Sequence, residues 1–302
     1  MHAKLGIAPI AWSNDDLPQL GGDTPLETCL SEAREAGFAG VELGGKFPRE
    51  THALNAVLSA HDLTLCSGWY SGTLLDNDLE AEKDQVRAQL DLFIGVDSPC
   101  LVYGETAGTI QNIQSRPLNT RRVPDDDQIR DYGKKLTAFA EFCAEEGMPI
   151  AHHHHMGTAI ETHAEVDALM NATGEAVGLL FDPGHLAFAG GDPLKMVTDH
   201  GKRIRHVHTK DVRMPIIDRL DRSSESFLDA VLKGAFTVPG DGSLDFNAIV
   251  QALADTGYEG WFVVEAEQDP AKANPLEYAR IGYAALTTAL DQAGYSYDAK
   301  TA

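Results

Sequence analysis

Residues 250–267 read VQALADTGYEGWFVVEAE. An amphipathic helical run ends at Gly257, a residue type that readily adopts the left-handed conformation of a helix C-terminal cap, and an apolar β-rich run follows directly. The same succession of helix, glycine and strand occurs around Gly37 and Gly147. Repeated units of this kind are typical of a parallel sheet whose strands are joined by helices.

Eight β-rich runs alternate with helical patterns along the chain. Because these units follow one another without a composition break or a long linker, and no GxGxxG fingerprint follows the first strand, the sequence predicts an α/β protein with one (β/α)8 TIM-barrel domain, residues 1–302. Two longer connections, 105–127 and 212–243, have the length of lids or binding loops. We expect strands at 4–10, 40–43, 64–70, 100–103, 149–153, 177–182, 204–210 and 261–265, and helices in segments such as 25–36, 79–94, 128–146 and 275–292.

The composition limits the class of partner. Lys and Arg total 24 against 46 for Asp and Glu, a formal net charge of -22. This charge disfavours nucleic acid and anionic membranes, and it leaves open whether the chain forms a homo-oligomer. The start of the chain lacks the features of a secretory signal, and apolar runs are too short to span a membrane, so we expect a cytoplasmic protein. The four widely spaced cysteines predict reduced thiols in the core.

Residues 152–155 are four consecutive histidines at the end of the fifth predicted strand. Strand side chains alternate between faces, so His153 and His155 share one face and His152 and His154 the other. Active-site groups of TIM barrels lie at the carboxyl ends of the strands. One of the two pairs is therefore expected to point into the barrel mouth.

The sixth and seventh predicted strands end on further ligand-type residues. Asp182 ends the sixth strand, and the turn that follows brings His185 back toward it, so both can face one pocket. On the seventh strand His208 is the favoured inward residue, while His206 lies deeper, where a hydrogen-bonded core histidine is the alternative.

The eighth predicted strand carries Glu265 and Glu267 on one face after an apolar run. An unpaired carboxylate deep in a barrel is unfavourable, so a cation is expected beside these two acids. A metal ion would serve, and the ammonium group of Lys210 is the alternative.

Together, one imidazole of the histidine run, Asp182, His208 and Glu265 form a mixed nitrogen and oxygen ligand set from four successive strands. Such a set favours Mn or Co, with Mg or Zn as alternatives. The first ligand is His153 or His155, and alternation alone does not choose between them.

Several segments resemble those of the inosose dehydratases, a branch of the xylose isomerase-like TIM barrels. The resemblance extends over nearly the whole chain and implies a metal-dependent hydro-lyase of inositol catabolism that removes water from a small polyhydroxylated ketone, 2-keto-myo-inositol, to give a trihydroxycyclohexane-dione. It also associates glutathione with the reaction, although we find no residue that explains this. The segments are GIAPIAWSNDD (6–16), GVELG (40–44), YGE (103–105), HHHMGT (153–158), FDPGH (181–185) and HVHTKDVR (206–213).

The resemblance also implies roles for single residues. The metal ligands of the superfamily fall on Asp182, His208 and Glu265, with His153 as first ligand where related keto-sugar epimerases have a glutamate. The substrate-contacting histidine falls on His185, and Arg213 lies near a substrate-binding arginine of those epimerases.

The chemistry assigns roles to the remaining polar groups near the strand ends. Proton carriers need a pKa near neutrality, which favours His155, His185 or Glu267, with Lys210 and Arg213 orienting oxygens. For substrate binding we expect Glu42 and Glu105 to contact hydroxyl groups. Aromatic side chains either pack on the apolar ring face or fill the barrel; these are Trp12, Trp69 and Tyr70.

Three other functions remain as alternatives. A keto-sugar or inosose isomerase or epimerase would use the same metal and enediolate chemistry but return the proton instead of expelling hydroxide. A metal-dependent endonuclease of the same superfamily is disfavoured by the negative charge. A non-catalytic sugar-binding protein would keep its function after chelation, whereas an enzyme of this type would not.

Overall fold

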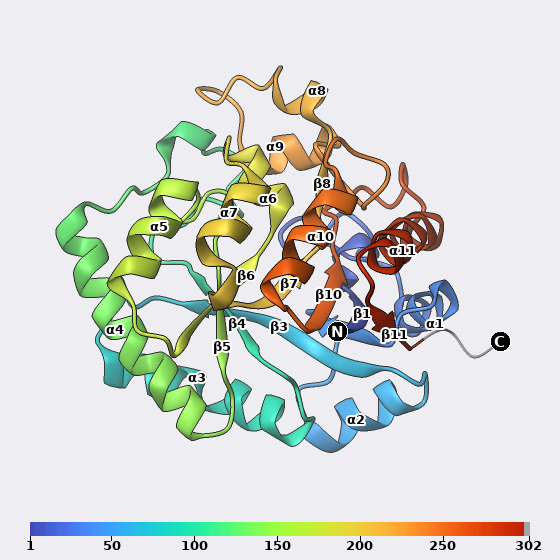
Figure 1. Cartoon of the computed structure of the whole chain (residues 1–302), viewed down its shortest axis with the longest axis horizontal. Coiled ribbons are helices and arrows are strands. Elements are labelled where there is room, and N and C mark those ends of the chain that lie inside the picture. The colour runs from blue at the N-terminus through green and yellow to red at the C-terminus, as the bar shows by residue number, and fades with distance from the viewer. Residues whose placement is uncertain (299–302) are drawn as a thin grey trace.

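The eight predicted strands pair in sequence order, and the last pairs with the first, so the sheet closes into a parallel barrel. This is the arrangement in a computed structural model, which describes residues 1–298 (Figure 1). The predicted (β/α)8 TIM barrel is confirmed. The strands are β1 (His2–Ile7), β2 (Gly40–Leu43), β3 (Thr64–Gly72), β4 (Leu101–Glu105), β5 (Ile150–His153), β6 (Val177–Phe181), β7 (Ile204–His208) and β10 (Gly260–Val264).

Helices form an outer layer around the strands (Figure 1). Gly37 and Gly257 take left-handed conformations at the ends of two of these helices, and Gly147 has a positive φ after a third, as the sequence predicts. The main helices are α1 (Leu26–Ala36), α2 (Thr51–Ser59), α3 (Leu79–Gly95), α4 (Asp126–Glu145), α5 (His163–Ala172), α7 (Pro193–His200), α10 (Phe246–Thr256) and α11 (Pro275–Gln292).

The structure also has shorter strands and helices besides the eight barrel strands and the main helices. The strands β8 (Asp211–Val212) and β9 (Phe236–Thr237) form an antiparallel pair, and β11 (Ser296–Tyr297) pairs with the start of β1. The remaining short elements are η1 (Pro9–Ala11), η2 (Leu118–Thr120), η3 (Gly201–Arg203), α6 (Pro183–Phe188), α8 (Met214–Ile217) and α9 (Phe227–Leu232).

Some strand ends differ from the prediction. The first strand was expected to reach residue 10, but it ends at Ile7, and Pro9 begins a 3-10 turn because proline has no N–H to donate to a strand ladder. The seventh and last strands also end earlier than expected. Lys210 and Glu265 therefore lie just beyond strands, in the segments that form the barrel mouth.

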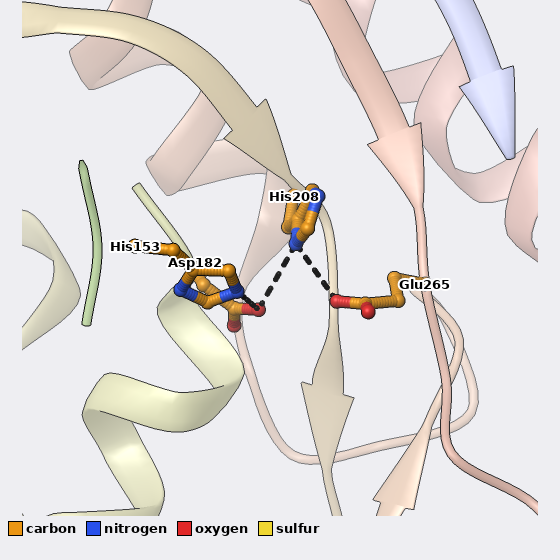
Figure 2. Close-up of side chains that lie close together, drawn as sticks. All are labelled: His153, Asp182, His208 and Glu265. Atoms are coloured by element: carbon orange, nitrogen blue, oxygen red, sulfur yellow. Dashed lines mark ion pairs between the residues drawn. The ribbon is translucent and has the colours of Figure 1, made fainter. Parts of the chain in front are cut away.

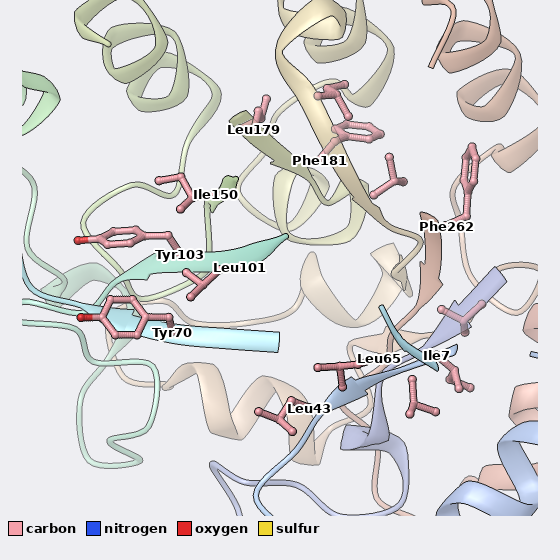
Figure 3. Close-up of a cluster of buried hydrophobic side chains, with 14 of the residues drawn as sticks. Ile7, Leu43, Leu65, Tyr70, Leu101, Tyr103, Ile150, Leu179, Phe181 and Phe262 are labelled. Atoms are coloured by element: carbon pink, nitrogen blue, oxygen red, sulfur yellow. The ribbon is translucent and has the colours of Figure 1, made fainter. Parts of the chain in front are cut away.

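A large apolar layer lies between the strands and the helices (Figure 3). Outward-facing residues of the strands contribute to it; Ile7, Leu65 and Phe262 are examples, each at most 3% exposed. Burying side chains of this size contributes roughly 1.5–3 kcal/mol each. This layer holds the helices against the barrel and orients the alternate residues inward.

The lower barrel interior is also apolar and closely fitted. Trp261, Val263 and Cys66 pack together there. A Cβ atom on Gly40 would lie 2.6 Å from the Trp261 ring, and one on Gly6 would lie 2.9 Å from the Cys66 sulfur. Glycine at these two positions therefore makes room for the tryptophan, which fills the floor of the barrel.

The structure agrees with the expectation for the cysteines. All four cysteines are free and buried. Among residues 1–298, no helix combines the length and the apolar character that crossing a membrane would require.

Candidate metal centre and active site

A pocket of about 490 Å³ opens at the carboxyl ends of the barrel strands. Its volume lies in the range of small-molecule sites. The strands supply histidines and carboxylates to its base, and loops supply polar groups to its rim. The lining residues are Ala8, Pro9, Ile10, Asp15, Asp16, Glu42, Leu43, Gly44, Trp69, Ser71, Val102, Thr106, Thr109, Gln111, Asn112, His153, His155, His208, Glu265 and Glu267.

Four residues from the ends of β5, β6, β7 and β10 converge beside this pocket (Figure 2). His208 Nδ1 lies 2.8 Å from Glu265 Oε2 and 3.6 Å from Asp182 Oδ2. His153 Nε2 lies 3.8 Å from Asp182 Oδ2. One potential ligand atom from each residue lies within 4.8 Å of the others. The structure thus brings the four residues together, and of the two candidate histidines it is His153 that lies with Asp182, His208 and Glu265.

Hydrogen bonds fix the orientation of both imidazoles. His153 Nδ1 donates to the carbonyl of His154 at 2.7 Å, so its Nε2 carries the lone pair that faces Asp182. His208 Nε2 lies 3.0 Å from Glu42 Oε1 and donates to it, which turns Nδ1 toward Glu265. A carboxylate behind a ligand histidine is a common support at metal sites.

The donor atoms themselves indicate whether a metal fits. Asp182 Oδ2, His208 Nδ1 and Glu265 Oε2 are buried, and none makes a well-directed hydrogen bond within the described part of the chain. An unsatisfied buried polar group costs about 1–3 kcal/mol. A divalent cation would satisfy these three atoms together with His153 Nε2, so the residues present fit a metal with mixed nitrogen and oxygen ligands.

The ammonium group of Lys210 supplies only part of the positive charge. It is fully buried, and Nζ lies 2.7 Å from Glu267 Oε2, 2.7 Å from His185 Nε2 and 3.1 Å from Glu265 Oε2. An ammonium has three protons to donate; Lys210 makes hydrogen bonds to His185 Nε2 and Glu267 Oε1, whereas its contact with Glu265 Oε2 is an ion pair without hydrogen-bond geometry. Asp182 Oδ2, at 3.7 Å, is left without one of those protons. Lys210 alone therefore does not satisfy all the buried ligand atoms of this centre.

The electrostatics keep the Asp182 carboxylate ionised. Burial alone would raise the pKa of Asp182, but Lys210 and His208 lower it to about 2. Burial alone would lower the pKa of His208, but Glu265 and Glu42 hold it well above its usual value. The same carboxylates that favour a second proton on His208 would favour a divalent cation in its place.

A second polar group adjoins the first. It consists of His155, His185 and Glu267 around Lys210, which donates to His185 Nε2 and to Glu267 Oε1 at 2.8 Å. The two imidazole rings are 3.9 Å apart between centroids, and His155 Nε2 lies 3.8 Å from Glu267 Oε1. All four residues expected to act in catalysis are therefore neighbours in the structure.

The four predicted substrate-binding residues divide into two pairs. Glu42 and Trp69 line the pocket, and the Trp69 ring meets both His153 and His155 edge-on. Glu105 and Arg213 do not line it.

Each residue of the second pair is held elsewhere by its own contacts. Glu105 points away from the barrel interior on the same face of β4 as Tyr103, and accepts hydrogen bonds from the Tyr103 hydroxyl and the Ala107 N–H. Arg213 pairs with Asp241 and donates to the carbonyl of Gly234 beside a separate cavity. The structure thus does not bring these two residues to the proposed substrate.

Several pocket residues were not identified from the sequence. Asp16 faces the pocket because the Asn14 side chain accepts hydrogen bonds from the N–H groups of Asp16 and Leu17, which fixes the loop after β1. Burial raises the pKa of the Asp16 carboxyl. The predicted binding loop 105–127 supplies further polar groups to the rim: Thr106, Thr109, Gln111 and Asn112.

Sequence comparisons relate this chain to known proteins. Residues 30–291 match the model of the family described as xylose isomerase-like TIM barrel. The rhizopine catabolism protein MocC of Rhizobium meliloti is 50% identical over 295 residues, which cover 98% of this chain and 91% of that protein. An inosose dehydratase of Geobacillus thermodenitrificans is 45% identical over 91% of this chain and 93% of its own length, and one of Clostridium tetani is 41% identical over the same shares.

Solved structures with low sequence identity share the fold. The probable 3-DHS dehydratase AsbF of Bacillus anthracis superposes with a TM-score of 0.69 at 16% identity, covering 94% of this chain and 98% of that one. The IolI protein with a bound zinc atom has a TM-score of 0.67 at 16% identity, covering 96% and 98%. At these identities the likeness concerns the barrel alone.

Proposed function

We propose, from the premise that this chain belongs to the xylose isomerase-like TIM barrel family and to its inosose dehydratase branch, that it is a hydro-lyase of inositol catabolism. It removes water from 2-keto-myo-inositol and forms a trihydroxycyclohexane-dione. The sequence identity of 41–45% to inosose dehydratases over 91% of the chain supports this substrate. The cytoplasm remains the expected location, and glutathione the expected added reagent.

The observation that carries the proposal is the convergence of ligand atoms from His153, Asp182, His208 and Glu265, of which Asp182 Oδ2, His208 Nδ1 and Glu265 Oε2 are buried without hydrogen bonds in the described chain. A divalent cation held there, Mn or Co by preference and Mg or Zn as alternatives, supplies a Lewis acid for the substrate carbonyl. Glu42 keeps His208 in the orientation this requires.

His155 is the proposed proton carrier. Its Nδ1 donates to the carbonyl of Met156 at 2.8 Å, so Nε2 has a free lone pair. In the proposed elimination, Nε2 takes the proton from the carbon beside the ketone and then gives it to the leaving hydroxyl, which departs as water. The C–H electrons form the new C=C bond, and the resulting enol becomes the dione. The Glu267 carboxylate, 3.8 Å away, stabilises the imidazolium between the two transfers.

Three neighbours of His155 set up the charges for this proton transfer: Lys210, Glu267 and His185. Burial alone would raise the pKa of Glu267, but the Lys210 ammonium lowers it, so the carboxylate stays ionised beside His155. Burial, with His155 and Lys210 nearby, holds the pKa of His185 well below its usual value. His185 therefore stays neutral, accepts a hydrogen bond from Lys210, and orients the ammonium group.

Side chains around the pocket orient the ring of the substrate. Glu42 at the base and Asp16 at the rim offer carboxylate oxygens to hydroxyl groups, and Trp69 offers an apolar surface to the C–H face of the ring.

A second candidate function is a step in rhizopine catabolism. The relative named for that process shares 50% identity with this chain, more than the inosose dehydratases of Geobacillus thermodenitrificans and Clostridium tetani share. The two functions differ in substrate, so turnover of 2-keto-myo-inositol compared with ketones derived from a rhizopine separates them.

The test starts from protein freed of metal by chelation and reloaded separately with Mn, Co, Mg or Zn, with and without glutathione. Incubation with 2-keto-myo-inositol is expected to give the ultraviolet absorbance of a conjugated enol-dione, absent in the chelated protein and in Glu265→Gln. Conversion to an isomeric inosose of unchanged mass would instead support an epimerase. No turnover with any of the four metals would refute the substrate assignment.

A further inference from the structure

A third group of histidines and carboxylates lies on the outer helices, and none of its members lines the pocket. His163 and Asp167 lie one turn apart on α5, while Asp199 and His200 lie at the end of α7. Both helices belong to the outer layer (Figure 1). His163 Nε2 is 3.1 Å from Asp199 Oδ2 and 3.6 Å from Asp167 Oδ1. One potential ligand atom from each of His163, Asp167 and Asp199 lies within 4.8 Å of the other two.

These separations match those between the ligands of a metal ion. In a tetrahedral zinc site with metal–ligand bonds of about 2.0–2.2 Å, neighbouring ligand atoms are about 3.4 Å apart. The two measured separations lie on either side of this value. His200 Nε2 donates to Asp167 Oδ1 at 2.6 Å and fixes that carboxylate in place, as outer residues do at metal sites.

We propose that His163, Asp167 and Asp199 form a second divalent-cation site, of zinc type, with water completing the coordination and His200 orienting Asp167. The chain carries a formal net charge of -22, which raises the concentration of cations near its surface. A cation here joins the start of α5 to the end of α7 and so stabilises the part of the barrel around β6.

The ordinary alternative is a set of ion pairs without a metal. Lys195 pairs with Asp199, and its ammonium would have to leave when a cation binds. The Lys195 side chain is 60% exposed, so it returns to water at little cost. The side chains of His163, Asp199 and Asp167 are 14%, 29% and 40% exposed, so an ion can reach all three from solvent.

The experiment counts zinc on the full chain. Chelated wild-type protein, titrated with Zn²⁺ alone, is expected to bind two ions, one at the pocket and one at the outer site. His163→Ala and the isosteric Asp199→Asn are expected to bind one and to keep the dehydratase rate after reloading with Mn or Co. His52→Ala, an exposed histidine outside the group, is the matched control and is expected to bind two.

A thermal measurement gives a second readout. In His208→Ala, whose pocket is expected to lose its ion, Zn²⁺ should still raise Tm, and adding His163→Ala should abolish that rise. Wild-type protein that binds a single ion, or His163→Ala that still binds two, would overturn the proposal. Because Asp199→Asn changes neither size nor helix propensity greatly, loss of one ion with an unchanged circular dichroism spectrum separates a missing ligand from misfolding.

Discussion

The lower and upper halves of the barrel interior use the same strands for opposite purposes. On β10 the inward residues Trp261 and Val263 fill the floor, and Glu265, two positions further on, reaches the polar mouth. The floor is apolar and closely fitted around glycines, whereas the mouth leaves several buried polar atoms without hydrogen bonds in the described chain. The floor is therefore expected to contribute mainly to stability and the mouth mainly to reactivity. A variant in the floor should lower the free energy of unfolding and keep the activity, and a variant in the mouth should do the reverse.

The largest effect is expected at the centre of the mouth. His208→Ala removes a ligand that contacts both Asp182 and Glu265, so metal content should fall and kcat/KM should drop by about 10³–10⁵-fold, several kcal/mol of transition-state stabilisation. Metal analysis and the absorbance assay measure the two quantities. His208→Asn, which keeps a polar side chain closer in size to histidine, is the control for the volume lost in His208→Ala. A variant with full metal content and wild-type rate would refute the role of His208.

Trp261→Ala tests the other half. It empties the barrel floor, and truncating a buried tryptophan costs about 3–5 kcal/mol of the free energy of unfolding. Urea denaturation should show this loss, while kcat of the folded fraction stays within about two-fold, since the metal-binding residues are untouched. Gly40→Ala is a matched variant, because its new methyl group would press on the same ring and destabilise by about 1–3 kcal/mol. A large fall in kcat with an unchanged midpoint would contradict the division between floor and mouth.

The sequence predicted the polar mouth because strand alternation is a local property. Once the strand ends were placed, period-two alternation put His153 with His155 and Glu265 with Glu267, and the structure has both pairs at the mouth. The same alternation, applied to β4, would have placed Glu105 with the outward Tyr103.

The directions of loop side chains could not be predicted in this way, because loop residues follow no regular alternation. Arg213 lies next to the small β8–β9 pair, which the sequence did not indicate, and Asp16 owes its direction to the Asn14 side chain. The separate places of His153 and His155 likewise depend on contacts between distant segments: one meets Asp182 and the other meets Glu267.

A finer test asks whether metal binding and proton transfer belong to separate groups of residues at the mouth. His155→Gln keeps a polar side chain of similar size but cannot carry a proton, so kcat should fall by about 10²–10³-fold. Metal content should stay as in wild-type protein, because the ligand set His153, Asp182, His208 and Glu265 does not include it. Equal losses of metal and rate would mean that His155 belongs to the metal centre and that the two groups are one.

The smallest effect is expected at Glu105. It tests whether a residue's position along the barrel axis or the face of the strand on which it lies decides its role. Glu105 lies at the level of the mouth but points outward, and burial raises the pKa of its carboxyl to about 7 from an ordinary value of 4.5. Between these values the folded state binds more protons than the unfolded state, so this group's contribution to stability is complete below pH 4.5 and is lost as pH rises through about 7. At about 1.4 kcal/mol per unit of pKa, the loss amounts to at most about 3 kcal/mol.

Glu105→Gln keeps a neutral side chain at every pH. Its free energy of unfolding should therefore change less than that of wild-type protein between pH 5 and pH 8, with rate and metal content unaffected. Urea titrations at several pH values measure this, and Glu80→Gln, which removes an exposed carboxylate of α3, is the control. If Glu105→Gln instead lost activity without changing the pH profile of stability, the carboxylate would act on the substrate, and position along the barrel axis would matter more than the face on which a side chain lies.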